Sequence, residues 1–202
     1  NEFLDYIFDE IDIDFVDLHK IGVTGCKSSN LSNTFKDVPI VKINEEEAIG
    51  RGVMALYDIY DESFVAVSTG TGTACIHHSE GKFNYLGGIS VGGGTLQGLS
   101  KYLISTENAK DIEELAIKGD RKKLDFLIGD VVNEVGSLNQ DITASNFGKA
   151  KNNKNNSKED TAASLSNMIG EVIGTISYLN ALLCNENKVY FTGRTSLNNV
   201  IK

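Results

Sequence analysis

Residues 68–100, STGTGTACIHHSEGKFNYLGGISVGGGTLQGLS, decide the organisation of this chain of 202 residues. They follow residues 64–67, a run of aromatic and apolar side chains that is typical of a buried strand. They contain two glycine-rich turns, GTGT at residues 70–73 and GGGT at residues 92–95, and the second turn leads into a predicted helix at residues 96–105. The order strand, turn, strand, turn, helix is therefore the unit around which we expect the chain to fold.

Both turns are suited to holding a phosphate-bearing ligand. Glycine has no Cβ, so its backbone can adopt positive φ angles and can approach another molecule closely. The N–H groups of residues 92–95 are predicted to lie free at the N-terminus of the following helix, where they and the helix dipole favour a bound anion. Two such turns in one unit predict a polyphosphate ligand.

The composition excludes several classes of function. The net charge is −9 and the sequence holds no block of Lys or Arg, which argues against nucleic acid as the main partner. No apolar run is long enough to span a bilayer, and no signal-peptide pattern is present, so no membrane partner is predicted. A hydrophobic content of 41% is enough for a sizeable core in one domain or in two small lobes.

The cysteines and the chain ends lead to two further expectations. Cys26, Cys75 and Cys184 are odd in number and widely spaced, so they form neither a disulfide framework nor a zinc pattern, and a reduced cytoplasm is the expected compartment. The chain begins without Met inside an expected helix, and its last expected helix has only just begun at Lys202. We therefore expect further residues beyond both ends.

The rest of the chain alternates between patterns typical of strands and helices. Strands are predicted at residues 16–23, 38–43 and 188–192, and helices at residues 3–8, 45–57, 111–117, 120–131 and 159–183. Residues 141–148 are predicted to form a capped helical turn. Residues 26–37 are predicted to be a polar loop with one helical turn, and residues 149–158 a polar loop. The helix at 159–183 has apolar residues at 3-4-3-4 spacing, which predicts a core helix that could also serve a dimer interface. A small-residue turn at 193–196 repeats the strand–turn–helix pattern of the first glycine turn.

An acidic turn opens the predicted helix at 45–57. Asn44 is expected to cap this helix, and Glu45, Glu46 and Glu47 follow it. The simpler interpretation is that the negative charges of the three glutamates interact favourably with the helix dipole and stabilise the helix N-terminus. The alternative is that one of them is a catalytic base at the junction of a strand and a helix, and the residues alone do not distinguish the three.

Other types of catalytic site find no support in the sequence. His77 and His78 are adjacent on a predicted strand, so their side chains point to opposite faces and cannot bind one metal ion together. His19 stands alone in the sequence. The GxSxG elbow and the P-loop pattern are both absent, and so is a Rossmann turn, so a different kind of loop must hold the predicted phosphate.

The order of these motifs resembles the type II pantothenate kinases. The resemblance covers the chain from about residue 18 to its end and rests on a Glu-led helix, GTGT after a strand, GGISVGGGTLQGL at residues 87–99, GDR at residues 119–121, and DITASNFG at residues 141–148. A long helix and the strand VYFTG then follow. This family belongs to the superfamily of acetate and sugar kinases, heat-shock ATPases and actin.

The resemblance implies an α/β fold of two ribonuclease-H-like lobes with a nucleotide cleft between them. Residues 1–62 would be the remainder of the N-terminal lobe, and residues 63–202 would be the nucleotide-binding lobe. It also implies transfer of a phosphoryl group from MgATP to the primary hydroxyl of pantothenate, the first step of coenzyme A synthesis. The nucleotide would be bound by Gly70, Thr71, Gly72, Thr73, Gly92, Gly93, Gly94, Thr95 and Gln97.

The same resemblance selects one glutamate of the acidic turn. The family pattern E-x-D-x-x-x-x-G matches residues 45–52 and places the catalytic base on Glu45. Glu45 would accept the proton of the attacking hydroxyl, while the glycine turns and Mg²⁺ would stabilise the charge that develops on the phosphate.

The chain departs from the family pattern in two ways. The family's first phosphate loop, an Asp-x-Gly-Gly-Thr turn that helps to hold the metal, has no match here, so no metal ligand is assigned. The family also has an arginine before the glycine cluster that contacts the substrate and the reacting phosphate. Tyr85 occupies that position, and tyrosine supplies neither the charge nor the fork of a guanidinium group. Tyr85 and Gly88 are therefore assigned to the substrate side of the site, with Lys82 as the nearest cation in sequence.

Three hypotheses for the function remain open from the sequence. The first is a pantothenate kinase that uses ATP and Mg²⁺, is cytoplasmic and homodimeric, and could respond to coenzyme A or acyl-CoA. The second is a paralogue that phosphorylates another small hydroxyl substrate and is marked by Tyr85. The third is a nucleotide- or acyl-CoA-binding regulator without turnover.

Overall fold

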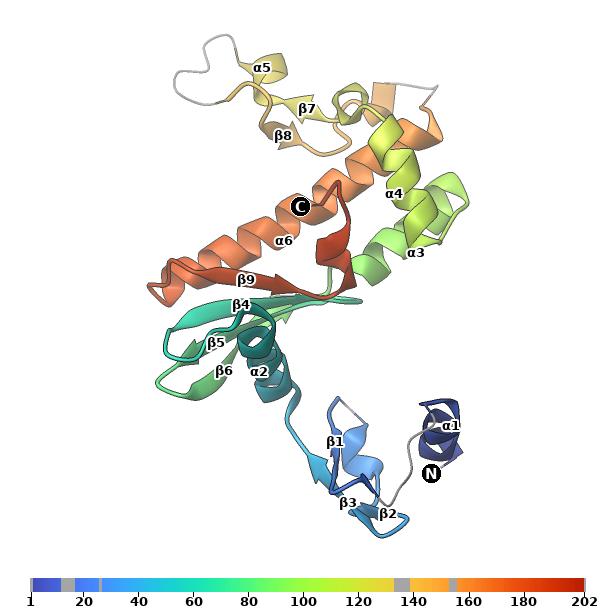
Figure 1. Cartoon of the computed structure of the whole chain (residues 1–202). Coiled ribbons are helices and arrows are strands. Elements are labelled where there is room, and N and C mark those ends of the chain that lie inside the picture. The colour runs from blue at the N-terminus through green and yellow to red at the C-terminus, as the bar shows by residue number, and fades with distance from the viewer. Residues whose placement is uncertain (1, 12–16, 26, 133–138, 153–155, 202) are drawn as a thin grey trace. The chain divides into compact units, whose positions relative to one another are not determined.

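The computed structural model describes residues 2–11, 17–25, 27–132, 139–152 and 156–201, and Cys26 lies outside this set. The chain forms two compact units, Asn1–Asp61 and Glu62–Lys202, which we call unit 1 and unit 2. Both units combine helices with strands, so the prediction of a mixed α/β protein is confirmed (Figure 1). Among the described helices, none has the length and apolarity that a bilayer crossing requires.

Unit 1 is built on a small sheet with strand order β1-β3-β2. Its elements in chain order are α1 (Glu2–Ile11), β1 (Ile21–Val23), the 3₁₀ helix η2 (Ser28–Asn30), β2 (Thr34–Phe35), β3 (Val38–Lys42) and α2 (Glu45–Tyr57). Leu4 of α1 packs on Phe35 and Ile40 of the sheet, and the rings of Phe8 and Phe35 stack with centroids 5.9 Å apart. Apolar burial on one face of α1 therefore holds this helix on the sheet.

Several predictions for unit 1 need correction. The strand predicted at 16–23 is limited to β1, although Val16 itself lies outside the described residues. The predicted loop at 26–37 contains its expected helical turn as η2. It also contains β2, because Lys36 and Asp37 adopt positive φ angles that close a hairpin with β3. Asn44 precedes α2 as expected, but its side chain makes no hydrogen bond to the helix.

Unit 2 is built on a four-stranded sheet with order β6-β5-β4-β9. Three antiparallel strands, β4 (Phe64–Thr69), β5 (Thr73–Ser79) and β6 (Lys82–Ile89), follow one another along the chain. The fourth, β9 (Val189–Thr192), pairs in parallel with β4, and Ser68 lies opposite Thr192. The carboxyl ends of β4 and β9 therefore leave the sheet side by side, and so do the turns that follow them.

One face of this sheet carries α6 (Lys158–Leu183), the long helix expected from the apolar spacing. Val65, Val67 and Cys75 of the sheet share one buried core with Leu165 and Ile169 of α6. Helices α3 (Gly93–Ile104) and α4 (Ala109–Lys118) pack against the N-terminal half of α6 (Figure 1). Helix α4 begins before the predicted residue 111 because the Asn108 side chain accepts hydrogen bonds from the Lys110 and Asp111 N–H groups.

The predicted helices at 120–131 and 141–148 are wrong over most of their lengths. Instead, the chain forms η3 (Arg121–Lys123), β7 (Phe126–Leu127), α5 (Ile128–Val131), β8 (Thr143–Ser145) and η4 (Ala150–Asn152), and β7 pairs with β8. The Lys149 N–H donates to the Leu124 carbonyl oxygen at 2.8 Å. The backbone groups that a helix would use are therefore engaged by a segment far along the chain. Lys149 is fixed in this way, so the predicted loop at 149–158 is not wholly solvated.

Asp125 anchors this segment to α6. Its side chain is fully buried, and its Oδ1 atom accepts hydrogen bonds from the Phe147 N–H at 2.8 Å and from Ser164 Oγ of α6 at 2.6 Å. The guanidinium of Arg121 lies 3.8 Å from Asp125 Oδ2 and also donates to Thr143 and Asp141. The motifs at 119–121 and 141–148 therefore form one polar network at the N-terminal end of α6, away from the glycine turns.

Asp160, in the first turn of α6, leads us to predict a loss of stability in acid. Burial raises the pKa of Asp160, but the Asp120 N–H, Ser157 and the Lys123 ammonium outweigh this effect and hold the pKa below its ordinary value. A carboxyl whose pKa is lower in the folded state stabilises the fold above its unfolded pKa of about 3.9, and this contribution disappears as the pH falls through the folded value. We expect the free energy of unfolding in urea to fall below about pH 4, and to fall less steeply in Asp160→Asn. Equal slopes for the two proteins would contradict this assignment.

Candidate nucleotide site

The two glycine turns predicted from the sequence bind each other directly. The turn between β4 and β5 supplies two carbonyl oxygens, and the first turn of α3 supplies the donors: Gly93 N–H to Gly70 O at 2.8 Å and Gly94 N–H to Thr71 O at 3.0 Å. The Gly92 N–H donates to Thr95 Oγ1 at 3.3 Å. Of the N–H groups at residues 92–95 that were predicted to be free, those of Gly92, Gly93 and Gly94 are therefore already used inside the protein.

The close approach of the two turns explains why glycine occupies these positions. A Cβ at Gly92 would lie 2.8 Å from Thr71 O and 2.9 Å from Gly72 C, and a Cβ at Gly94 would lie 2.6 Å from Thr71 Cγ2. These separations are shorter than van der Waals contact, so any other residue at position 92 would push the backbones apart. The glycines permit contact between the two turns, in addition to any contact with a ligand.

A third turn joins the same junction from the far end of the chain. After β9, Gly193 has a φ of +94°, and a Cβ there would lie 2.5 Å from Thr69 O. The hydroxyl of Thr195 then donates to Gly70 O at 3.1 Å, so the Gly70 carbonyl oxygen accepts hydrogen bonds from both Gly93 and Thr195. The turn at 193–196 and the first glycine turn, which have similar sequence patterns, also lie close together in space. The parallel pairing of β4 with β9 brings them there. The expected helix after this turn is the short 3₁₀ helix η5 (Arg194–Leu197), which begins before the predicted residue 197.

These turns form one wall of a pocket of about 410 Å³ in unit 2. The remainder of the pocket comes from the first turns of α3 and α4. Its lining consists of Gly70, Thr71, Gly93, Gly94, Leu96, Gln97, Ala109, Lys110, Glu113, Arg194, Thr195, Leu197 and Asn198. A cavity of this size with glycine backbone, two cations and three apolar side chains on its walls suits a small anionic ligand with an apolar part.

The charged side chains of the pocket have different surroundings. Glu113 Oε1 accepts hydrogen bonds from the Asn199 N–H at 2.9 Å and from Asn199 Nδ2 at 2.6 Å, which ties the segment after η5 to α4. The ammonium of Lys110 lies 4.0 Å from Glu114 on its own helix. Arg194 is exposed and has no hydrogen-bond or ion-pair partner among the described residues. The pocket therefore presents more positive than negative charge to a ligand.

The predicted nucleotide residues fall into two groups. Gly70, Thr71, Gly93, Gly94 and Gln97 line the pocket. Gly72, Thr73, Gly92 and Thr95 are not part of its lining. Thr73 Oγ1 donates to Val91 O at 2.8 Å, and Thr95 Oγ1 donates to Ser90 O at 3.1 Å. Their roles in nucleotide binding stay predictions, and the hydroxyls of Thr73 and Thr95 are occupied by backbone carbonyls.

The sequence interpretation missed the pocket residues outside the glycine stretch. Lys110 and Glu113 lie in the first turn and a half of α4, and Arg194, Thr195 and Asn198 follow β9. The repeated strand–turn pattern at 188–196 was the signal that could have located the second set. For Lys110 and Glu113, the available signal was Asn108, a typical helix-capping residue that indicates the start of α4.

The predicted substrate residues lie on β6, an edge strand of the described sheet. Tyr85 is 61% exposed and pairs with Ile76, while Gly88 pairs with Ala74 so closely that a Cβ would collide with the Thr73 carbonyl oxygen. The register shifts between these pairs at a β-bulge, where Gly87 has a φ of +114°. The assignment of Tyr85 and Gly88 to a substrate stays a prediction.

The predicted base belongs to unit 1. Glu45 is the first residue of α2 and is exposed. Two residues further along, Glu47 Oε1 accepts a hydrogen bond from Arg51 Nε at 2.8 Å, an ion pair along the helix. Glu47 therefore has a structural partner on its own helix. The role of Glu45 as a base stays a prediction.

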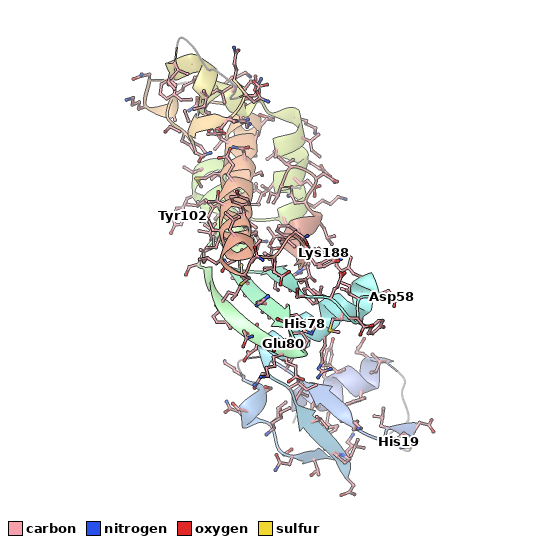
Figure 2. All side chains as sticks on the ribbon, turned by 90° about the vertical axis from the view of Figure 1, so that its left-hand side faces the viewer. His19, Asp58, His78, Glu80, Tyr102 and Lys188 are labelled. Atoms are coloured by element: carbon pink, nitrogen blue, oxygen red, sulfur yellow. The ribbon has the colours of Figure 1, made fainter. Side chains whose placement is uncertain are left out.

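The histidines bind separate partners, as their adjacent positions on a strand predicted. His77 Nε2 lies 2.8 Å from Glu186 Oε1, while His78 Nδ1 lies 3.0 Å from the Glu62 carbonyl oxygen (His78 is labelled in Figure 2). The ring of His78 packs between Phe64 and Phe83, with centroids 5.0 and 4.8 Å away. Within the described residues, no three His, Cys, Asp or Glu side chains are grouped in a way that could hold a metal ion.

Comparison with known proteins finds one family. A sequence model described as Fumble matches residues 56–201. A type II pantothenate kinase from Bacillus thuringiensis subsp. konkukian is 35% identical over 195 residues, which is 92% of this chain and 69% of the relative. Type II pantothenate kinases from Bacillus anthracis and Oceanobacillus iheyensis are 34% and 31% identical, covering 91% and 88% of this chain and 68% and 67% of the relatives.

Proposed function

The chain belongs to the Fumble family, the family of type II pantothenate kinases, and on this basis we propose that it phosphorylates pantothenate with ATP to give 4′-phosphopantothenate. The observation that supports this most directly is the pocket in unit 2, whose walls include residues of three glycine-containing turns and two cations, Lys110 and Arg194. Backbone N–H groups and guanidinium or ammonium groups are the partners that proteins use for nucleotide phosphates.

We propose that ATP occupies this pocket, with its phosphates against the glycine turns. The Gly70 and Thr71 carbonyl oxygens, which would repel a phosphate, are held by donors from Gly93, Gly94 and Thr195. Thr71 lines the pocket, and within the described part of the chain its N–H group makes no hydrogen bond, so it is available as a donor. The apolar side chains of Leu96, Ala109 and Leu197 would face the nucleoside.

In the proposed reaction, the primary hydroxyl of pantothenate attacks the γ-phosphorus of ATP and ADP leaves. Glu45 takes the proton of the attacking hydroxyl, and a bond from oxygen to phosphorus replaces the bond to the leaving oxygen of ADP. For Glu45 to act in this way, the chain must adopt the two-lobe architecture that the resemblance implies, with ribonuclease-H-like lobes on either side of a cleft. The antiparallel β4-β5-β6 strands followed by helices and parallel β9 in unit 2 are compatible with such a lobe.

The residues present do not fit a dedicated Mg²⁺ site. No group of three potential ligands occurs among the described residues, and Glu113, the carboxylate in the described pocket lining, is engaged by Asn199. We therefore treat Mg²⁺ as part of the MgATP substrate and assign it no protein ligand.

The decisive experiment measures ADP release by the purified protein with ATP and Mg²⁺, in the presence and absence of pantothenate. We expect turnover that depends on pantothenate. Turnover with another small hydroxyl compound, but not with pantothenate, would identify the chain as a paralogue of different specificity. ATP binding without turnover on any of these compounds would instead identify a nucleotide-binding regulator.

We also propose that the protein is a homodimer that works in the cytoplasm and that coenzyme A or acyl-CoA regulates it. The C-terminal half of α6 exposes Tyr178, Leu179, Leu182 and Leu183, and Leu183 is 84% exposed. A contiguous apolar helix surface of this kind is a frequent protein–protein interface. Sedimentation equilibrium should give twice the chain mass, and a Leu182→Glu, Leu183→Glu variant should sediment as a monomer. A monomeric wild-type protein would contradict the proposal.

A further inference from the structure

Arg194 differs from the other two arginines of the chain in having no partner among the residues that the structure describes. Arg51 pairs with Glu47 at 2.8 Å, and Arg121 donates to Thr143 Oγ1 at 2.9 Å and to Asp141 O at 2.8 Å. Arg194 makes no hydrogen bond or ion pair with the described residues, yet it lines the pocket of unit 2. An unpaired arginine on an open surface is ordinary, but on the wall of a concave site it is a candidate for binding an anion.

The backbone of Arg194 is fixed on both sides. The preceding Gly193 adopts a positive φ and sits against the backbone of Thr69, and the following Thr195 donates its hydroxyl to Gly70 O at 3.1 Å. In the same turn, Ser196 Oγ donates to Gly193 O at 2.7 Å. The Cα of Arg194 is therefore held beside the first glycine turn. A residue placed in this way can bring its guanidinium to a ligand at Gly70 and Thr71.

The other charged groups of the pocket are less able to bind a phosphate. Lys110 lies near Glu114 on α4 and is 82% exposed, and Glu113 is an anion already engaged by Asn199. A guanidinium group offers a planar fork of N–H donors that matches two phosphate oxygens, whereas an ammonium acts as a point charge. We propose that Arg194 is the residue of this chain that binds the phosphates of the nucleotide. The proposal rests on the proposed function and adds a residue outside the glycine motifs to the same site.

The test measures binding of ATP, ADP and adenosine by isothermal titration calorimetry, without pantothenate, to wild type, Arg194→Gln and Arg194→Lys. Charge-assisted hydrogen bonds support an expected loss of about 10- to 100-fold in ATP affinity for Arg194→Gln. The loss should be smaller for ADP, and adenosine should bind all three proteins equally. Arg194→Lys should recover part of the ATP affinity, because it keeps the charge but not the fork.

A matched control removes the same charge elsewhere in unit 2. Lys118 lies in the last turn of α4 and is not part of this pocket, so Lys118→Gln should leave ATP affinity unchanged. Equal ATP affinity in wild type and Arg194→Gln, or equal losses for ATP and adenosine, would overturn the proposal. A wild-type protein that binds ATP through Arg194 but shows no turnover with pantothenate would leave this inference intact and contradict the proposed function. A wild-type protein that binds no ATP would overturn both.

Discussion

Glu45→Gln is expected to lower the turnover number by about 100- to 10,000-fold, the range typical of losing a general acid or base, while ATP binds as tightly as before. The substitution keeps the shape of the side chain but removes its ability to accept a proton at neutral pH. Glu45 belongs to unit 1 and the pocket belongs to unit 2, so the change leaves the pocket lining intact. Steady-state kinetics with pantothenate, together with calorimetry for ATP, separate the loss of chemistry from the loss of binding.

The neighbouring glutamates provide the control for this experiment. Glu46→Gln removes one negative charge from the same helix turn and should leave turnover within about threefold of wild type, because its charge contributes only through the helix dipole. Glu47→Gln breaks the ion pair with Arg51 and should affect stability slightly and turnover little. If Glu46→Gln or Glu47→Gln abolishes turnover and Glu45→Gln does not, the base has been assigned to the wrong residue.

Gly92→Ala is expected to abolish measurable ATP binding and to destabilise unit 2 by about 1–3 kcal/mol, the usual effect of overpacking. The new methyl group would lie 2.8 Å from Thr71 O and 2.9 Å from the backbone of Gly72. Both neighbours are backbone atoms, so the clash cannot be relieved by a side-chain rotation. The two glycine turns must separate, which breaks the hydrogen bonds from Gly93 to Gly70 and from Gly94 to Thr71. Calorimetry with ATP and urea unfolding measure the two effects.

Gly98→Ala provides a matched comparison six residues further along the chain. Gly98 lies inside α3, and a Cβ there has no heavy atom within 4 Å. Because alanine loses less conformational entropy in a helix, this variant should be about 0.5–1 kcal/mol more stable than wild type. If both variants lose ATP binding to the same extent, steric contact between the turns is not the reason that glycine is required.

The parts of the fold that the sequence predicted well depend on local patterns. The glycine turns mark the end of β4 and the start of α3, because only glycine tolerates such close backbone contact. Helix α6 was predicted from the helical spacing of its apolar residues. Residues 120–131 were predicted incorrectly because their structure depends on Asp125, which reaches Phe147 and Ser164. The periodicity of a short segment carries no information about such distant partners.

The candidate site shows the same division between local and distant determinants. The pattern of glycines located one wall of the pocket, with Gly70, Thr71, Gly93 and Gly94. The interpretation did not place Arg194 and Thr195 there, because the parallel pairing of β4 with β9 is what brings this turn to Gly70, and Thr195 is 125 positions further along the sequence. The engagement of the Gly93 and Gly94 N–H groups escaped the sequence interpretation for a related reason, since their partners, Gly70 O and Thr71 O, lie in the other turn.

The Gly70 carbonyl oxygen accepts hydrogen bonds from Gly93 and Thr195. The bond from Thr195, which lies far along the sequence, affects how the folding chain acquires its activity. Contacts between residues so far apart in sequence form late, because the entropy of closing the long loop must be overcome before they contribute any stability. A partly folded chain with β4, β5 and α3 in place, but with β9 not yet inserted, would therefore lack part of the pocket. Since a ligand that binds only the native state stabilises it, nucleotide would favour completely folded molecules over such intermediates during synthesis and refolding.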